Sequence, residues 1–163
     1  NSEGNLEIDW TLVDQNRSAL NDASRIHDEA IGHLREKYPR GRITSNLRLM
    51  TGNLFSQRLP QILKPEKFDL VLSLNFLSEL PKPKRLPIVQ TVLRDYVSDE
   101  GKFLIIEPAL QLTTRDLMEL RDGLTERESG FVHAPCLHQA PCPMMRANHR
   151  DWCAPHDSHA VGQ

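Results

Sequence analysis

The sequence predicts an α/β domain built on a mostly parallel β-sheet with helices on both faces. Segments whose apolar residues recur at helical spacing alternate along the chain with short apolar runs, as they do in βαβ units. These runs are continuously apolar and do not alternate with polar residues, which is typical of buried parallel strands. The chain has 163 residues, 39% of them hydrophobic, which is enough for one such core.

The first part of the chain contains one predicted βαβ unit. Residues 8–14, with the sequence Ile-Asp-Trp-Thr-Leu-Val-Asp, are predicted to form a buried strand. Residues 17–37 carry apolar side chains at helical spacing and are predicted to form an amphipathic helix, which Pro39 and Gly41 terminate. Residues 47–50 are predicted to form a second, short strand.

The next part repeats this alternation. Residues 68–74 give the clearest strand pattern, and residues 102–107 give another that follows a glycine. Between them, a helix is predicted from the apolar stripe of Leu86, Val89, Val92, Leu93 and Tyr96. A last helix is predicted with Thr113 or Thr114 as its N-cap.

The pattern changes after residue 130, where Pro, Cys and His become frequent and periodicity is lost. We therefore predict three parts: a partial core at 1–130, a cysteine-rich metal-binding segment at 131–157, and a disordered tail at 158–163. No internal repeat is present.

Charge and composition exclude several classes of protein. The net charge is -2 and the pI is about 6.4, so an RNA contact must come from a local patch or from residues outside this sequence. No apolar run approaches the roughly 20 residues that span a bilayer, and no signal peptide is recognisable. An odd, clustered set of cysteines also argues against a disulfide framework and favours a reducing compartment.

Polar residues stand at or just after the ends of the predicted strands: Asp14, Asn53, Asn75 and Glu107. Ligands of parallel sheets bind at the carboxyl ends of the strands, so we expect these four side chains along one rim. Asp14 is a candidate to accept hydrogen bonds from a ribose diol, and Asn53 a candidate to meet a nucleobase edge. Asn75 is a candidate for the reaction site. The alternative for each is an ordinary turn or cap residue.

The three cysteines are candidate metal ligands. Cys136, Cys142 and Cys153 lie in a proline-flanked segment, and three thiolates suit zinc or an iron–sulfur cluster. A fourth ligand would come from His138, His149, His156 or residues outside this sequence. The alternative is three free thiols packed as small apolar groups.

Four runs of sequence carry a resemblance to a known family. They are FDLVLSLNFLSELP at 68–81, GKFLIIEPA at 101–109, HAPCLHQAPCPM at 133–144 and DWC at 151–153. They resemble the methyltransferase-like proteins of the small ribosomal subunit, which occur in mitochondria and bacteria. The resemblance extends over about residues 11–153, and its cysteine motifs are the most specific part.

The resemblance implies a Rossmann-like class I methyltransferase fold that binds S-adenosylmethionine, with Asp14, Asn53 and Asn75 as cofactor-binding residues. It also implies a [4Fe-4S] cluster, or alternatively zinc, with Cys136, Cys142 and Cys153 as three of its ligands. The family's first strand, its glycine-rich loop and its fourth cysteine have no counterpart in this sequence.

Three functions are consistent with these residues. The first is a methyltransferase acting on small-subunit ribosomal RNA, in the bacterial cytoplasm or the mitochondrial matrix. The second is a catalytically inactive, RNA-binding assembly factor, and the third is a metal-stabilised interaction domain. No nucleophile–base pair is recognisable. Methyl transfer does not require one, because the sulfonium donor is already activated and positioning supplies much of the rate. No membrane partner is expected.

Overall fold

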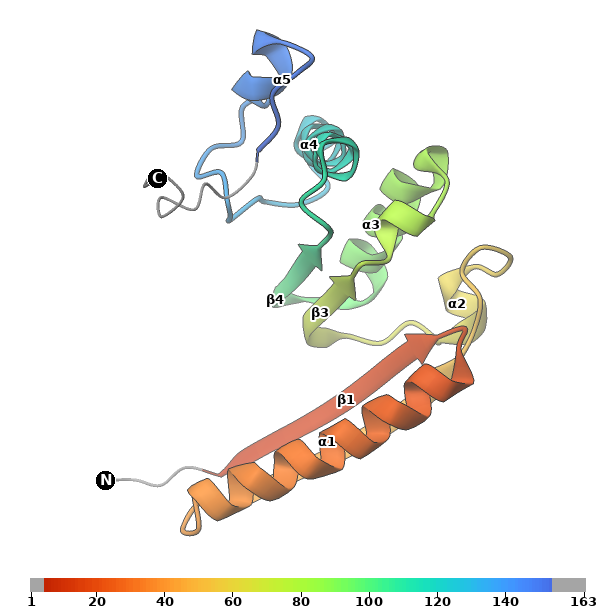
Figure 1. Ribbon diagram of the computed structural model, residues 1–163, viewed down its shortest axis with the longest axis vertical. Coiled ribbons are helices and arrows are strands. Elements are labelled where there is room, and N and C mark those ends of the chain that lie inside the picture. The colour runs from red at the N-terminus through yellow and green to blue at the C-terminus, as the bar shows by residue number, and fades with distance from the viewer. Residues whose placement is uncertain (1–4, 154–163) are drawn as a thin grey trace, which may run out of the picture. The chain divides into compact units, whose positions relative to one another are not determined.

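The computed structural model describes residues 5–153, and the chain folds as two compact units, Asn1–Lys64 and Pro65–Gln163 (Figure 1). Each unit contains one two-stranded parallel sheet. The α/β class and the parallel pairing are therefore confirmed. Within the described residues each pair of strands forms its own two-stranded sheet, an arrangement that is compatible with a Rossmann-like fold, and the single sheet stays a prediction.

The first unit is a single βαβ motif followed by a short helix. Its elements are β1 (Leu6–Asp14), α1 (Arg17–Lys37), β2 (Ile43–Thr51) and α2 (Leu59–Ile62). β1 and β2 pair in register along their whole length. Helix α1 runs back beside β1, which brings the next strand in parallel to the first (Figure 1).

Local chemistry explains where α1 starts and how it packs. The Asn16 side chain accepts hydrogen bonds from the amides of Ser18 and Ala19, at 2.9 and 3.3 Å, and so caps the first turn. On the packed side of the helix, Nε2 of His27 lies 2.8 Å from Oγ of Ser45 in β2. The helix is thus tied to the strand that follows it.

The second unit holds the remaining elements. They are β3 (Phe68–Leu74), the 3-10 helix η1 (Leu77–Glu79), α3 (Lys82–Asp95), β4 (Val97–Ile106), α4 (Gln111–Glu126) and α5 (Pro143–Ala147). β3 and β4 pair in parallel, with a register irregularity between Phe68 and Leu70. Residues that follow α4 form mainly loops, as the loss of periodicity predicts.

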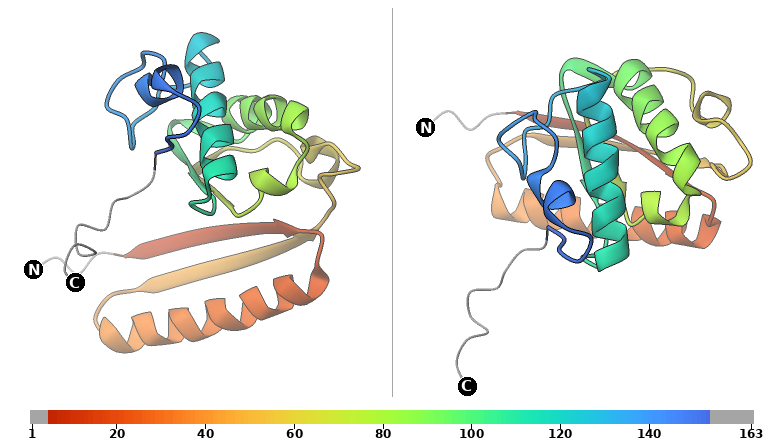
Figure 2. Two further views of the ribbon diagram at one scale, coloured as in Figure 1. Left: turned by 45° about the horizontal axis from the view of Figure 1, so that its top comes forward. Right: turned by 90° about the horizontal axis from the view of Figure 1, so that it is seen from above.

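Helices α3 and α4 pack against each other (Figure 2). Both helices carry buried apolar side chains, Val89 and Val92 in α3 and Met118 and Leu120 in α4, and an ion network joins the two helices. Asp116 of α4 lies 2.5 Å from Arg85 and 3.1 Å from Lys82 of α3. Arg85 also donates to the Ser78 carbonyl of η1 at 3.1 Å, so its guanidinium connects α3, α4 and η1.

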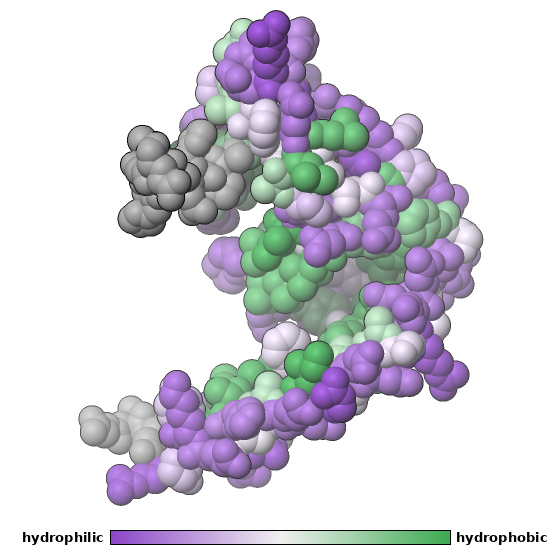
Figure 3. All heavy atoms as spheres, viewed as in Figure 1, coloured by the Kyte–Doolittle hydropathy of each residue, from purple (hydrophilic) through white to green (hydrophobic). Residues whose placement is uncertain are grey.

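One face of the β3–β4 sheet carries exposed apolar side chains. Its exposed side chains are Leu70, Leu72, Leu74, Leu104 and Ile106, and they gather over these two strands in the space-filling view (Figure 3). Within the second unit α3 packs against β4, and the expectation of helices on both faces of the sheet stays a prediction. The continuous apolar pattern of these strands is explained because apolar side chains lie on both faces of the sheet.

Several boundaries differ from those expected. β2 starts at Ile43 and β4 at Val97, both earlier than predicted. Helix α4 starts at Gln111, so Thr113 lies in its first turn, where the hydroxyl donates to the Pro108 and Leu110 carbonyls and does not cap the helix. Within residues 5–153, no helix is long and apolar enough to cross a membrane. The predicted disordered tail at 158–163 lies outside the described residues.

Candidate functional site

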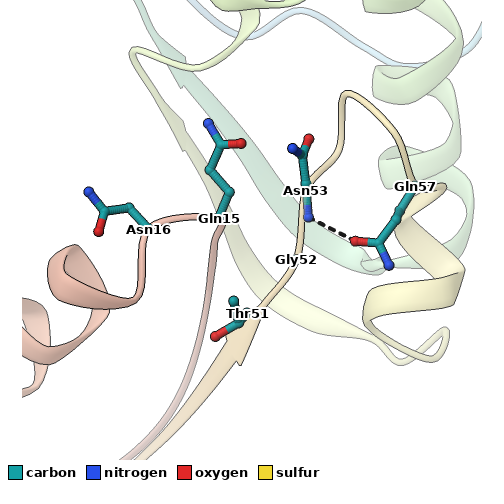
Figure 4. Close-up of a pocket in the computed structure, with 6 residues that line it drawn as sticks. All are labelled: Gln15, Asn16, Thr51, Gly52, Asn53 and Gln57. Carbon is teal, nitrogen blue, oxygen red and sulfur yellow. Dashed lines mark hydrogen bonds between the residues drawn. The ribbon is translucent and has the colours of Figure 1, made fainter.

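A polar hollow lies in the first unit, at the carboxyl ends of β1 and β2 (Figure 4). It has a volume of about 510 Å³, and its lining residues are Gln15, Asn16, Thr51, Gly52, Asn53 and Gln57. Four of these side chains are amides, which can both donate and accept hydrogen bonds. The hollow therefore offers uncharged polar groups at the edge of the sheet where ligands of parallel sheets bind.

Gly52 allows the chain to leave β2 at this edge. Its amide donates to the Asp14 carbonyl at 3.0 Å, which continues the strand pairing by one residue. A Cβ atom at Gly52 would lie 2.4 Å from Cγ2 of Ile62, closer than real contacts allow. A glycine is thus needed here for close packing against α2.

Asp14 ends β1 with a carboxylate that is only partly used. Its Oδ1 accepts a hydrogen bond from the Asn16 amide at 2.6 Å. Within the part of the chain that the structure describes, Oδ2 makes no hydrogen bond, and the residue is exposed. This oxygen is free to accept a hydrogen bond from a hydroxyl group of a ligand.

Asn53 has a defined role in the turn that follows β2. Its side-chain oxygen accepts from the Phe55 amide at 2.8 Å, and its own amide donates to Oε1 of Gln57 at 2.9 Å. The acceptor of the side chain is therefore occupied, while its Nδ2 donors make no hydrogen bond within residues 5–153. Asn53 is a turn residue that can still donate to a ligand.

Asn75 and Glu107 form a second pair, in the other unit, at the ends of β3 and β4. The Asn75 amide donates to the Ile106 carbonyl at 2.8 Å, and Asn75 has a φ of 50°, in the left-handed region. The four residues that were predicted to share one rim thus form two pairs, one in each unit.

Both carboxylate oxygens of Glu107 accept hydrogen bonds from backbone amides. Its Oε1 accepts from Phe76 at 2.9 Å and Leu77 at 2.7 Å, and its Oε2 accepts from Ser78 at 3.2 Å. These amides belong to the turn that enters η1. Glu107 therefore stabilises the start of a helix, and its carboxylate has a structural role.

The three cysteines differ in their surroundings. Cys142 is buried, Cys136 is half-buried and Cys153 is exposed. Among residues 5–153, no three His, Cys, Asp or Glu side chains lie close enough to hold a metal ion. The predicted ligand set of three thiols therefore stays a prediction. Of the candidate fourth ligands, His156 lies outside the described residues.

Side chains of α4 hold the cysteine-rich segment by its backbone. Arg121 donates to the carbonyls of His138 and Ala140, the latter at 2.6 Å. Arg115 donates to the Asp151 carbonyl at 2.6 Å. Sequence analysis missed these arginines, because a side chain that bonds to a distant carbonyl leaves no spacing or motif in the sequence.

Comparisons with known proteins identify the family. The family model described as mitochondrial small ribosomal subunit Rsm22 matches residues 9–161. Over 122 residues the chain is 36% identical to the human protein "Ribosome assembly protein METTL17, mitochondrial". That match covers 69% of this chain and 26% of the human protein, so the chain spans about a quarter of that relative's length. No solved structure matches. The chain belongs to the Rsm22 family of the mitochondrial small ribosomal subunit.

Proposed function

We propose that this chain is part of a mitochondrial-matrix protein that binds small-subunit ribosomal RNA during assembly and has a Rossmann-like class I methyltransferase core. The family match and the name of the human relative, a ribosome assembly protein, support the assembly role. Parallel strands joined by helices, present in both units, are compatible with this fold.

The cofactor proposal rests on Asp14, because its Oδ2 makes no hydrogen bond within the described residues. Asp14 ends a parallel strand, and its Oδ2 is available to accept a hydrogen bond from a ribose hydroxyl of S-adenosylmethionine. Asn53 would donate from Nδ2 to a ring nitrogen of the adenine, because its own oxygen is already occupied. Asn75 would line the site of methyl transfer.

Calorimetric titration with S-adenosylmethionine tests the cofactor site, using this chain and a longer one that includes the preceding residues of the protein. Asp14→Asn is expected to weaken binding about tenfold or more, because a hydrogen bond to a charged acceptor is lost. Asp22→Asn removes the same charge from an exposed position of α1 and should leave binding unchanged. Absence of heat with the longer chain rejects the cofactor.

Two activities remain to be distinguished. A methyltransferase would transfer labelled methyl groups to small-subunit RNA, and Asp14→Asn would reduce that transfer. The second candidate is an inactive assembly factor, and the observation that favours it is the name of the human relative, which describes ribosome assembly. Binding of the cofactor without any transfer of label would establish this second candidate.

The metal centre is proposed from the cysteine motifs alone, since the thiols do not form a site in this structure. Cys136, Cys142 and Cys153 would supply three ligands to a [4Fe-4S] cluster. Anaerobically purified protein would then be brown and absorb near ~400 nm, as thiolate-ligated clusters do. Colourless protein with one zinc per chain would establish the alternative, and protein free of both metals would reject the centre.

A further inference from the structure

The last turn of α1 and the turn that leads from it to β2 concentrate positive charge in a chain whose net charge is -2. Arg35, Lys37, Arg40 and Arg42 fall within residues 35–42, where Glu36 is the one acid. We name these four cations, together with Tyr38, the basic turn. All five side chains are exposed. Such a cluster is a local electrostatic feature that the overall charge conceals.

The backbone of the basic turn is held by hydrogen bonds. The Tyr38 amide donates to the Leu34 carbonyl at 3.0 Å, and the Gly41 amide donates to the Tyr38 carbonyl at 3.1 Å. The Leu6 amide of β1 donates to the Arg42 carbonyl at 2.9 Å, and Pro39 restricts φ inside the turn. The cations are therefore displayed from an ordered backbone, which lowers the entropy lost when a ligand binds.

The positive charges of the basic turn are largely unneutralised. Within residues 5–153, the Arg40 and Arg42 guanidinium groups make no hydrogen bond or ion pair. Nε of Arg35 donates to the Ile43 carbonyl at 3.2 Å, and its terminal nitrogens make no hydrogen bond with the described residues. These planar groups can make paired hydrogen bonds to phosphate oxygens.

An exposed aromatic ring stands among these cations. Tyr38 is 51% exposed, and Nζ of Lys37 lies 5.5 Å from the centre of its ring. A surface that contacts only water does not require an exposed aromatic side chain. Cations beside an exposed aromatic are the combination by which proteins bind single-stranded nucleic acids, with bases stacked on the ring and phosphates on the cations.

We infer that the basic turn binds single-stranded RNA, with Arg35, Arg40 and Arg42 on phosphates and a base stacked on Tyr38. This inference rests on the proposed contact with ribosomal RNA. The turn lies at the far end of α1 from the polar hollow (Figure 1). A helix of 21 residues is roughly 30 Å long, so the RNA contact is separate from the cofactor site.

Salt-dependent binding of a fluorescein-labelled, single-stranded RNA to the full chain tests this inference. Each phosphate contact contributes about 0.7 to the slope of log affinity against log salt. The double variant Arg40→Gln/Arg42→Gln is expected to reduce that slope by about 1.4. The control Arg127→Gln/Arg146→Gln removes the same charge from exposed positions in the second unit and should leave the slope unchanged.

Stacking on Tyr38 is tested separately. Tyr38→Leu should lower affinity about fivefold or more without changing the salt slope, whereas Tyr38→Phe should preserve affinity. Equal slopes for the two double variants, or absence of RNA binding at low salt, would overturn the inference. So would variants of the basic turn that reduce binding to phosphatidylserine vesicles but not to RNA.

The outcomes separate this inference from the cofactor proposal. If S-adenosylmethionine binds but the RNA slope does not respond to the basic turn, only the RNA surface is rejected. If the RNA slope responds while the cofactor gives no heat, the RNA surface stands and the cofactor proposal is rejected.

Discussion

The backbone amide of Cys142 donates to both carboxylate oxygens of Asp122, at 2.9 Å each. Cys142 is buried, and Asp122 also accepts from the neighbouring Arg121 at 2.6 Å. Arg121 in turn donates to the carbonyls of His138 and Ala140, which shortly precede Cys142. The segment is therefore docked on α4 by an aspartate and an arginine that are adjacent in sequence, through contacts that involve no metal.

Replacement of Asp122 should release this docking. Asp122→Ala leaves the buried Cys142 amide without an acceptor, which should cost about 1–3 kcal/mol of unfolding free energy. Hydrogen exchange should become faster at the amides of residues 132–142. Glu126→Ala, at an exposed position of the same helix, is the control. Unchanged exchange in the Asp122 variant would show that other contacts dock the segment.

Glu107 should contribute to stability through the turn at residues 75–78. Glu107→Gln retains one acceptor oxygen but replaces the other with a donor, so the Ser78 amide loses its partner. We expect a loss of about 1–2 kcal/mol in urea unfolding. Glu100→Gln removes the same charge from an exposed position of β4. An equally large loss of unfolding free energy in Glu100→Gln would show that the change in net charge causes the effect.

Asp116 should make stability depend on pH in the acid range. Burial acts to raise the pKa of this carboxyl, but hydrogen bonds from Arg85 and Lys82 outweigh burial and hold the pKa below its ordinary value of 3.8. A lowered pKa in the folded state gives stability that is fully present above about pH 4 and is lost as pH falls through the folded-state pKa.

Asp116→Asn tests this pH dependence by chemical unfolding. The difference in unfolding free energy between wild type and variant should be constant from about pH 5 to 7 and should shrink below about pH 4. Asp99→Asn, at an exposed position, serves as the charge-matched control. A difference that grows on acidification would contradict the assignment.

Gly52 and Gly32 should respond in opposite directions to alanine. Gly52→Ala forces a Cβ against Ile62 and should destabilise the first unit by about 1–3 kcal/mol. At Gly32, inside α1, a Cβ meets no atom within 4 Å, so Gly32→Ala should stabilise by about 0.5–1 kcal/mol. Thermal unfolding measures both. Ile62→Ala should relieve the clash in the Gly52→Ala background, and a double variant no better than Gly52→Ala would exclude that clash as the cause.

Much of the fold was predictable from local sequence. Helix α1 has its predicted bounds, and β3 has its predicted bounds at Phe68–Leu74. These features depend on apolar periodicity and on capping and breaking residues that lie close together in the chain. Helix η1 and the earlier start of β4 were not predicted. Both depend on partners distant in sequence, such as Glu107 for η1 and β3 for β4.

The candidate site shows the same division. The sequence alone placed acids and amides at strand ends and the cysteines in one proline-rich segment. Only the tertiary structure decided that Asp14 keeps an unused oxygen while Glu107 gives both of its oxygens to backbone amides. The physical reason is that residue type and spacing determine which hydrogen bonds a side chain can make. Which of them it does make depends on the donors that the folded chain brings within about 3 Å.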